Sequence, residues 1–190
     1  MNKRKKKYAI RVFCALALLF SMVITVSAAS TTLDVKRVKQ AKSQWCWAAV
    51  GEMIGTYMNS SSSRTQWDIV AYIKGSKYPD DPGSDNEIIK GIKYASMNTV
   101  TYTSGSTLSW DEHVTNIESG YPIGVKMDWN SNGAHALVCA GTKTIGQSNY
   151  LYIIDPWEDY SSEWYKYTEL KNGTTIHSGT GKYITSFWKD

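Results

Sequence analysis

The sequence predicts an α+β domain in which a helical N-terminal half packs on a C-terminal antiparallel sheet. In the first half, apolar residues recur at helical spacing. The second half instead contains short runs rich in Val, Ile, Leu, Tyr and Trp, separated by turn residues. Helices followed by consecutive strands are typical of α+β folds. No linker interrupts the 190 residues, so we expect a single folded domain.

The first 29 residues have the pattern of an export signal. A lysine-rich start precedes an apolar stretch, and small residues follow at positions 27–29. We therefore predict a signal peptide at residues 1–29 and a secreted domain at residues 30–190. The alternative is an uncleaved membrane anchor, since residues 12–29 approach the length of a membrane span. We expect contact with a membrane only through this segment, before cleavage.

The formal charge of +4 comes from the same N-terminal segment. It holds six of the 21 basic residues and no acid, so residues 30–190 carry 15 basic and 17 acidic residues. The predicted domain therefore lacks the basic excess typical of nucleic-acid-binding proteins, and we expect no nucleic-acid partner. The sequence shows no zinc-ligand spacing and no glycine-rich phosphate loop, so we expect no metal and no cofactor. We also expect a monomer.

Four helices are predicted. The first runs from Cys46 to Met58 and contains Gly51 and Gly55. Because each glycine costs a helix about 1 kcal/mol relative to alanine, the two indicate a closely packed neighbour. The other three helices are predicted to begin at capping residues, and the first of them runs from Thr65 to Ile73. The next begins at Ser84, which forms a capping box with Glu87, and reaches Tyr94. The last begins at Ser109, which forms a second capping box with Glu112, and ends near Gly120.

The second half is predicted to form strands with turns between them. The turns are predicted at residues 130–133 and 141–148, where Gly, Asn and Ser are frequent. The strands are predicted at residues 123–129, 134–140, 150–154, 164–167 and 183–188.

Cys46 is a candidate nucleophile because it stands at the start of the first predicted helix, where Ser43 is a candidate cap. The positive end of the helix dipole favours a thiolate at that position. The alternative is that Cys46 packs as a small buried hydrophobe. A nucleophilic cysteine also needs a base that a third group holds in place.

His135 and Asp155 are the candidates for that base and its partner. His135 opens one predicted strand and Asp155 ends the next, so pairing of the strands places both at the same end of the sheet. Asp155 can then accept the ring N–H of His135 and fix its tautomer. The alternatives are a structural histidine and an Asp-Pro turn. His113 and His177 are predicted to lie at the surface.

Together these residues resemble the papain-like cysteine peptidases. Cys46-Trp47-Ala48 is similar to the Cys-Trp-Ala that opens the nucleophile helix of that family. Gln40 lies six residues before Cys46, the spacing at which the family places its oxyanion-hole glutamine. The strand from His135 to Gly141 resembles the histidine strand of the family. Residues 155–157, Asp-Pro-Trp, resemble its Asn/Asp-x-Trp motif.

The resemblance is strongest to the compact bacterial branch, which includes avirulence-type effector proteases, staphopains and bacteriocin-leader peptidase-like domains. Only 89 residues separate Cys46 from His135, and 20 separate His135 from Asp155. Trp45 before the nucleophile also suits that branch. The Gly-Ser that precedes the plant cysteine is absent, and no activation segment is evident, which leaves the control of activity open.

The resemblance implies a peptidase that acts on proteins or peptides. Cys46 would attack the peptide carbonyl, His135 would protonate the leaving amine, and Asp155 would orient His135. Gln40 and the backbone N–H of Cys46 would bind the oxyanion, with the side chain of Gln44 as the rival donor.

Three further expectations follow from the resemblance and from these residues. Trp157 would shield the His135–Asp155 hydrogen bond from water, and Trp47 would pack the helix. Cys139 is expected to be buried and inert, because Cys46 cannot contact His135 and also form a disulfide with a cysteine about 13 Å along the strand. Two other functions stay open: another cysteine hydrolase or an acyl transferase acting on cell-wall peptides, and a non-catalytic secreted binding module of the same fold.

Overall fold

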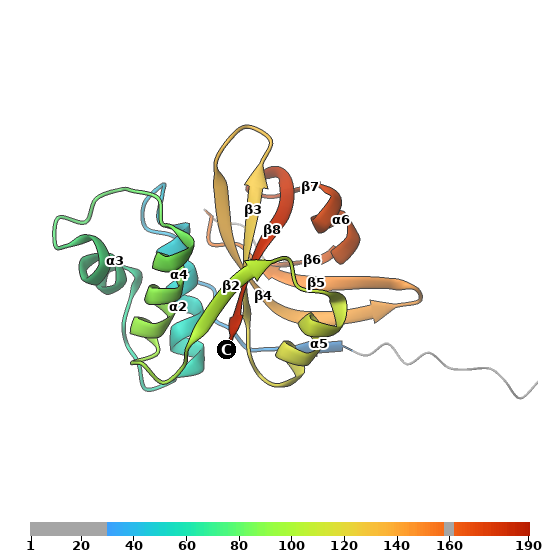
Figure 1. Cartoon of the computed structure of the whole chain (residues 1–190), viewed down its shortest axis with the longest axis horizontal. Coiled ribbons are helices and arrows are strands. Elements are labelled where there is room, and N and C mark those ends of the chain that lie inside the picture. Colours follow the sequence, from blue (N-terminus) through green and yellow to red (C-terminus); the bar gives the residue numbers. More distant parts are fainter. Residues whose placement is uncertain (1–29, 158–161) are drawn as a thin grey trace, which may run out of the picture.

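The computed structural model describes residues 30–157 and 162–190, so the predicted signal peptide lies outside the described residues. Helices α2, α3 and α4 gather on one side of the molecule, and the strands form a twisted sheet on the other (Figure 1). Helices α5 and α6 lie against the sheet. The structure confirms the predicted α+β arrangement.

The helices begin close to the predicted capping residues. Thr65, Ser84 and Ser109 each form a capping box with the acidic residue three positions later. Helix α6 was not predicted, because its single turn and a half is too short to show a helical period. The helices are α2 (Cys46–Met58), α3 (Gln66–Lys74), α4 (Asp85–Ala95), α5 (Trp110–Glu118) and α6 (Tyr167–Asn172).

The two glycines of α2 let that helix approach α4 closely. A Cβ atom on Gly55 would lie 2.4 Å from the Cβ atom of Ala95, and one on Gly51 would lie 3.2 Å from backbone of Gly91. The close neighbour that the glycines predicted is therefore α4.

We expect Gly55→Ala to destabilise the domain by about 1–3 kcal/mol, because alanine overpacks this contact by more than its helix propensity gains. The free energy of unfolding, measured by urea denaturation, checks this. Gly51→Ala is the matched control and should lower the free energy of unfolding less, because the atoms nearest to an added Cβ lie 3.2 Å away at Gly51 and 2.4 Å away at Gly55. A Gly55→Ala variant as stable as the parent would show that the two helices separate without cost.

The strands form one antiparallel sheet in the order β2-β8-β3-β4-β5-β6, with β1 paired to β4 and β7 paired to β8. The short strands β1, β2 and β7 were not predicted because their residues are mostly polar and small. The strands are β1 (Ser30–Thr32), β2 (Tyr102–Ser106), β3 (Ile123–Trp129), β4 (Ala134–Ile145), β5 (Ser148–Ile154), β6 (Glu163–Lys166), β7 (Thr174–Ile176) and β8 (Gly179–Lys189).

The predicted turn at residues 141–148 is wrong. Strands β4 and β5 continue through this region as a hairpin that closes where Ile145 pairs with Ser148. Gly141 lies inside β4, and a Cβ atom there would come within 2.8 Å of the carbonyl oxygen of Thr31. Gly141 therefore makes room for β1 and does not mark a turn; Gly146, at φ 60°, lies in the turn.

Strand β4 separates two hydrophobic cores because its side chains alternate between the faces of the sheet. Ala136 and Val138 join the core formed with α2, α3 and α4. Leu137 and Cys139 join the core on the other face. Cys46 packs against the first core, so the sheet lies between the two thiols. Both are free cysteines, as predicted.

His113 is buried, which corrects its predicted place on the surface. Its Nδ1 lies 2.8 Å from the carbonyl oxygen of Ser109, and its Nε2 lies 3.1 Å from the hydroxyl of Tyr183. Burial lowers the pKa of His113 to about 4, so the ring is neutral near pH 7. The prediction failed because the sequence of α5 does not show that this face packs on the sheet.

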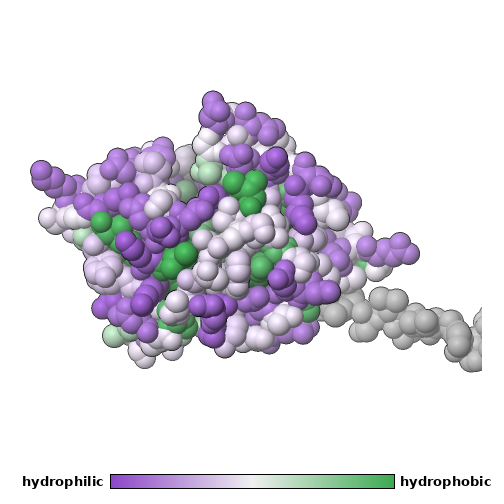
Figure 2. Space-filling model, viewed as in Figure 1, coloured by the Kyte–Doolittle hydropathy of each residue, from purple (hydrophilic) through white to green (hydrophobic). Residues whose placement is uncertain are grey.

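The surface in view is largely polar. Figure 2 shows hydrophilic side chains over most of this face, with small separate apolar patches between them. In the described part of the chain, no helix is long and apolar enough to cross a membrane.

Candidate active site

A pocket lies where the helical half meets the sheet. Cys46 and Trp47 line it from α2, and Trp129 and His135 line it from β3 and β4. The loop before α4 contributes Pro82 and Gly83, Trp157 follows β5, and Ser178 comes from the turn between β7 and β8.

Cys46 is the first residue of α2, at the helix end where backbone N–H groups have no acceptor within the helix. Ser43 does not cap the helix, contrary to the prediction. Its hydroxyl instead donates to Asp80 Oδ2 at 2.8 Å, and the backbone N–H of Gln44 donates to Asp80 Oδ1 at 2.8 Å. Asp80 therefore anchors the loop that leads to Cys46. Asp80 carries no recognisable signal in the sequence, since an aspartate in a Pro-Asp-Asp-Pro segment indicates only a turn.

Two buried tryptophans fix the same loop to the segment before α4. Trp45 Nε1 donates to the carbonyl oxygen of Pro79 at 2.9 Å, and Trp47 Nε1 donates to that of Asp81 at 3.1 Å. A Cβ atom on Gly83 would lie 2.3 Å from the Trp47 ring, so Gly83 lets the chain lie flat on the indole. Trp47 thus packs helix α2, as the resemblance implied.

His135 and Asp155 meet at the same end of the sheet, as strand pairing predicted. His135 Nε2 lies 2.8 Å from Asp155 Oδ1. Because a carboxylate only accepts, Nε2 carries the proton, and Nδ1 is left for the Cys46 thiol, with which the ring also interacts. The His135 ring stacks on Trp129 and meets the edge of Trp157, with centroids 5.8 Å and 6.1 Å away.

The surroundings of His135 and Asp155 favour the charged form of both side chains. Burial disfavours the imidazolium, but the hydrogen bond to Asp155 and the interaction with Cys46 outweigh it and raise the pKa of His135 to about 9. Burial also opposes the carboxylate of Asp155, yet the contact with His135 holds its pKa below the ordinary value. The site therefore favours an imidazolium next to Cys46 near neutral pH.

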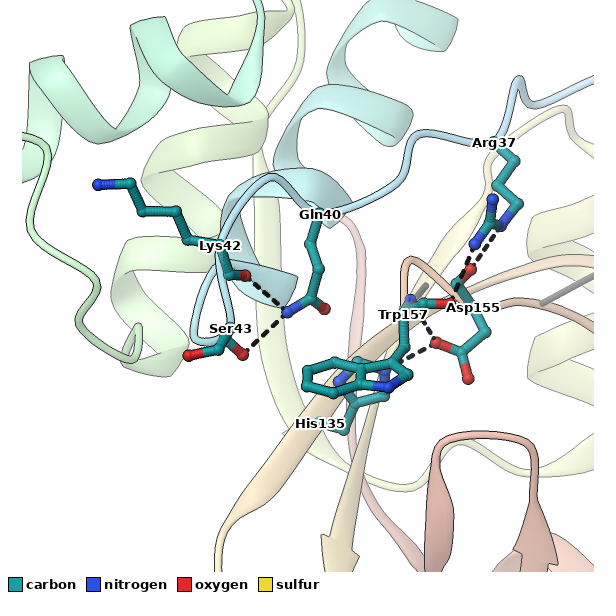
Figure 3. A network of polar contacts seen from close by, with 7 residues as sticks. All are labelled: Arg37, Gln40, Lys42, Ser43, His135, Asp155 and Trp157. Atoms are coloured by element: carbon teal, nitrogen blue, oxygen red, sulfur yellow. Dashed lines mark hydrogen bonds and ion pairs between the residues drawn. The ribbon is translucent and has the colours of Figure 1, made fainter. Parts of the chain in front are cut away.

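A second set of hydrogen bonds holds Asp155 in place (Figure 3). Its Oδ1 accepts the backbone N–H of Trp157 at 2.8 Å. Arg37 Nε donates to the backbone oxygen of Asp155 at 2.7 Å, and Nη2 donates to that of Trp157 at 3.1 Å. Arg37 was not identified from the sequence, because its partners, the backbone oxygens of Asp155 and Trp157, lie 118 and 120 residues further along the chain.

Gln40 is buried beside the site, but its amide faces its own loop (Figure 3). Its Nε2 donates to the carbonyl oxygens of Lys42 and Ser43, at 2.8 Å and 2.9 Å. These bonds use both amide hydrogens. Gln44, and not Gln40, lines the pocket. Within residues 30–157 and 162–190, no group of His, Cys, Asp or Glu side chains is placed to hold a metal ion.

This fold and this pocket define the class of papain-like cysteine peptidases. A family model described as papain-like cysteine protease AvrRpt2 matches residues 29–171, which is more than half of the chain. The chain belongs to that family, and the predicted class of enzyme is confirmed.

Solved structures share the fold. A Bacillus anthracis protein assigned as a C39-like peptidase superposes with a TM-score of 0.55 at 11% identity, covering 84% of this chain and 97% of the other. A structure from work on the mite allergens Blo t 1 and Der p 1 superposes with a TM-score of 0.50 at 12% identity, covering 88% and 73%. A comparison with curated protein sequences finds no match.

Proposed function

We propose that this chain is an exported peptidase that hydrolyses peptide bonds through Cys46, His135 and Asp155. The observation that supports it most directly is the pocket in which the Cys46 thiol interacts with His135 while Asp155 Oδ1 accepts the ring N–H at 2.8 Å. Covalent peptide hydrolysis requires a nucleophile in contact with a base, and a third group that orients the base.

In the proposed mechanism, Cys46 attacks the peptide carbonyl as a thiolate paired with the imidazolium of His135. The imidazolium then gives its Nδ1 proton to the leaving amine, and a thioester remains. Water attacks the thioester with His135 as general base, which releases the acid product and returns the thiol. Asp155 keeps the ring oriented and stabilises its charge in both steps.

The oxyanion would be bound by the backbone N–H of Cys46 and by a glutamine side chain. We propose Gln40 as that second donor: the substrate oxygen would replace one of the two loop carbonyls that Nε2 now contacts. Gln44 is the rival because its side chain already lines the pocket.

We expect Gln40→Ala to lower kcat by about 10²–10³-fold with little change in KM, since an oxyanion donor acts in the transition state. Steady-state kinetics of Gln40→Ala and Gln44→Ala on one peptide substrate check this, and thermal melting shows whether loss of the loop bonds unfolds Gln40→Ala. A loss of kcat of this size in Gln44→Ala, with Gln40→Ala as active as the parent, would assign the role to Gln44.

We expect Asp155→Ala to impair catalysis less than loss of Cys46, because Asp155 acts through His135. Asp155→Asn should be milder, since the amide oxygen can still accept the ring N–H. Comparing kcat/KM of the two variants with that of the parent checks this. An Asp155→Asn variant as inactive as Cys46→Ala would mean that the carboxylate does more than orient the ring.

A labelling experiment tests the proposed function as a whole. The protein is incubated with an epoxide inhibitor of papain-like enzymes, and its cleavage of an unbiased peptide library is measured with and without the inhibitor. We expect one label per chain, on Cys46, and cleavage that the label abolishes. Labelling without cleavage of any peptide would favour another acyl-transfer reaction, and a chain that neither labels nor cleaves would favour a binding module.

Export is supported by the sequence of residues 1–29. Mass spectrometry of the protein from the culture medium should find an N-terminus near Ala29 or Ser30. Retention of the full chain in the membrane fraction would instead indicate an anchor.

A further inference from the structure

The carboxylate of Asp155 is only half satisfied by the contacts described above. Oδ1 accepts from both His135 and Trp157. Oδ2 is buried and has no hydrogen-bond partner. A buried carboxylate oxygen without a donor is costly, so a donor near Oδ2 is expected to matter for the stability of the charged form.

Ser178 presents the matching unsatisfied group. It lies in the turn between β7 and β8, where Ile176 pairs with Gly179. Its Oγ is also buried and also lacks a partner of good geometry. The two side chains are nevertheless close enough that the serine hydroxyl helps to lower the pKa of Asp155, behind the larger effects of burial and of His135.

The residues after Ser178 fix the turn against the catalytic pair. A Cβ atom on Gly179 would lie 3.3 Å from the Trp129 ring, and one on Gly181 would lie 2.7 Å from it. The Trp129 indole therefore lies directly on the backbone of early β8. Because Trp129 also stacks on His135, the turn has a fixed place relative to His135.

We propose that Ser178 is a positioning residue of this site: its hydroxyl rotates to donate to Oδ2 of Asp155 and so fixes the plane of the carboxylate. Oδ1 then stays directed at Nε2 of His135, and the negative charge that stabilises the imidazolium is retained. The inference deepens the proposed function and rests on it, since it concerns the same catalytic pair.

Kinetics of three single variants test the proposal. Ser178→Ala should lower kcat by about tenfold with KM unchanged, the size expected for a lost hydrogen bond to a charged group. Ser178→Thr keeps the hydroxyl and should retain most of the activity. Thr180→Ala is the matched control: it removes a hydroxyl of the same hairpin that contacts Thr175, and it should behave like the parent.

A double-variant cycle separates positioning from a structural role. Adding Ser178→Ala to Asp155→Ala should cause no further loss, because the group that Ser178 acts on is already gone. An equal tenfold loss in that background would overturn the proposal. A rise in KM with kcat unchanged would also overturn it, since it would place Ser178 against the substrate.

The rate at which iodoacetamide alkylates Cys46 provides a readout that needs no peptide substrate. At neutral pH, Ser178→Ala should slow alkylation, because a less firmly held His135 stabilises the thiolate less, and Ser178→Thr should restore the rate. If the parent cleaves no peptide but alkylation still follows this pattern, the proposed function fails and the role of Ser178 stands. An unchanged alkylation rate in a folded Ser178→Ala variant would refute the role even in an active peptidase.

Discussion

Replacing Cys46 with alanine is expected to abolish peptide hydrolysis and leave the fold intact. The thiol is the only group in the proposed mechanism that forms a bond to the substrate, so no other side chain can replace it. Cys46 is partly exposed in the pocket and its neighbours Trp45 and Trp47 are buried, so loss of its sulfur should leave their packing unchanged. Hydrolysis of a peptide that the parent cleaves, measured with equal amounts of protein, checks this.

Cys139→Ala is the matched control for loss of a thiol. Cys139 is fully buried in the second core, where burial raises its pKa to about 12, so it stays a neutral thiol. We expect this variant to keep its activity and to lose some stability instead. Measurable peptide cleavage by pure, folded Cys46→Ala would show that the proposed nucleophile is wrong.

The order of helices and strands was predictable from the sequence because each long element carries its own local pattern. The capping boxes at Ser84 and Ser109 and the apolar period of residues 46–58 depend only on neighbouring residues. Short elements such as α6 and β7 carry no such pattern, since their place is set by what they pack on. Gly141 misled the prediction because a glycine needed for the approach of another strand has the same sequence appearance as one in a turn.

The residues of the sequence motifs could be predicted as members of the candidate site, but the residues that hold them in place could not. Cys46 lies at the start of a helix, and His135 and Asp155 lie at strand ends that the pairing of β4 with β5 brings together. The sequence shows all three of these ends. Arg37 holds the backbone of Asp155, and Asp80 anchors the loop before α2. Both contacts join residues that are far apart in the sequence, so no local pattern predicts them. The orientation of the Gln40 amide is likewise set by the path of the loop that its Nε2 contacts.

His135→Ala is expected to lower kcat/KM by about 10³-fold or more, nearly as much as loss of Cys46, because base and nucleophile act as one unit. The double variant Cys46→Ala, His135→Ala should then be as inactive as Cys46→Ala alone. A folded His135→Ala variant that keeps most of the parent's kcat/KM would show that the two residues do not act as one unit.

The pH dependence of the parent gives an independent check on His135. The ring has a pKa near 9 in the folded chain, above its ordinary value of 6.5, so the imidazolium is present at neutral pH and is lost as the pH rises through 9. We expect kcat/KM to fall on the alkaline side near pH 9. The same linkage makes the charged ring stabilise the fold below about pH 6.5, and this contribution disappears above pH 9. The stability of the parent relative to His135→Ala should therefore decline over that range, and a difference that stayed constant would mean that the ring is not charged in the native site.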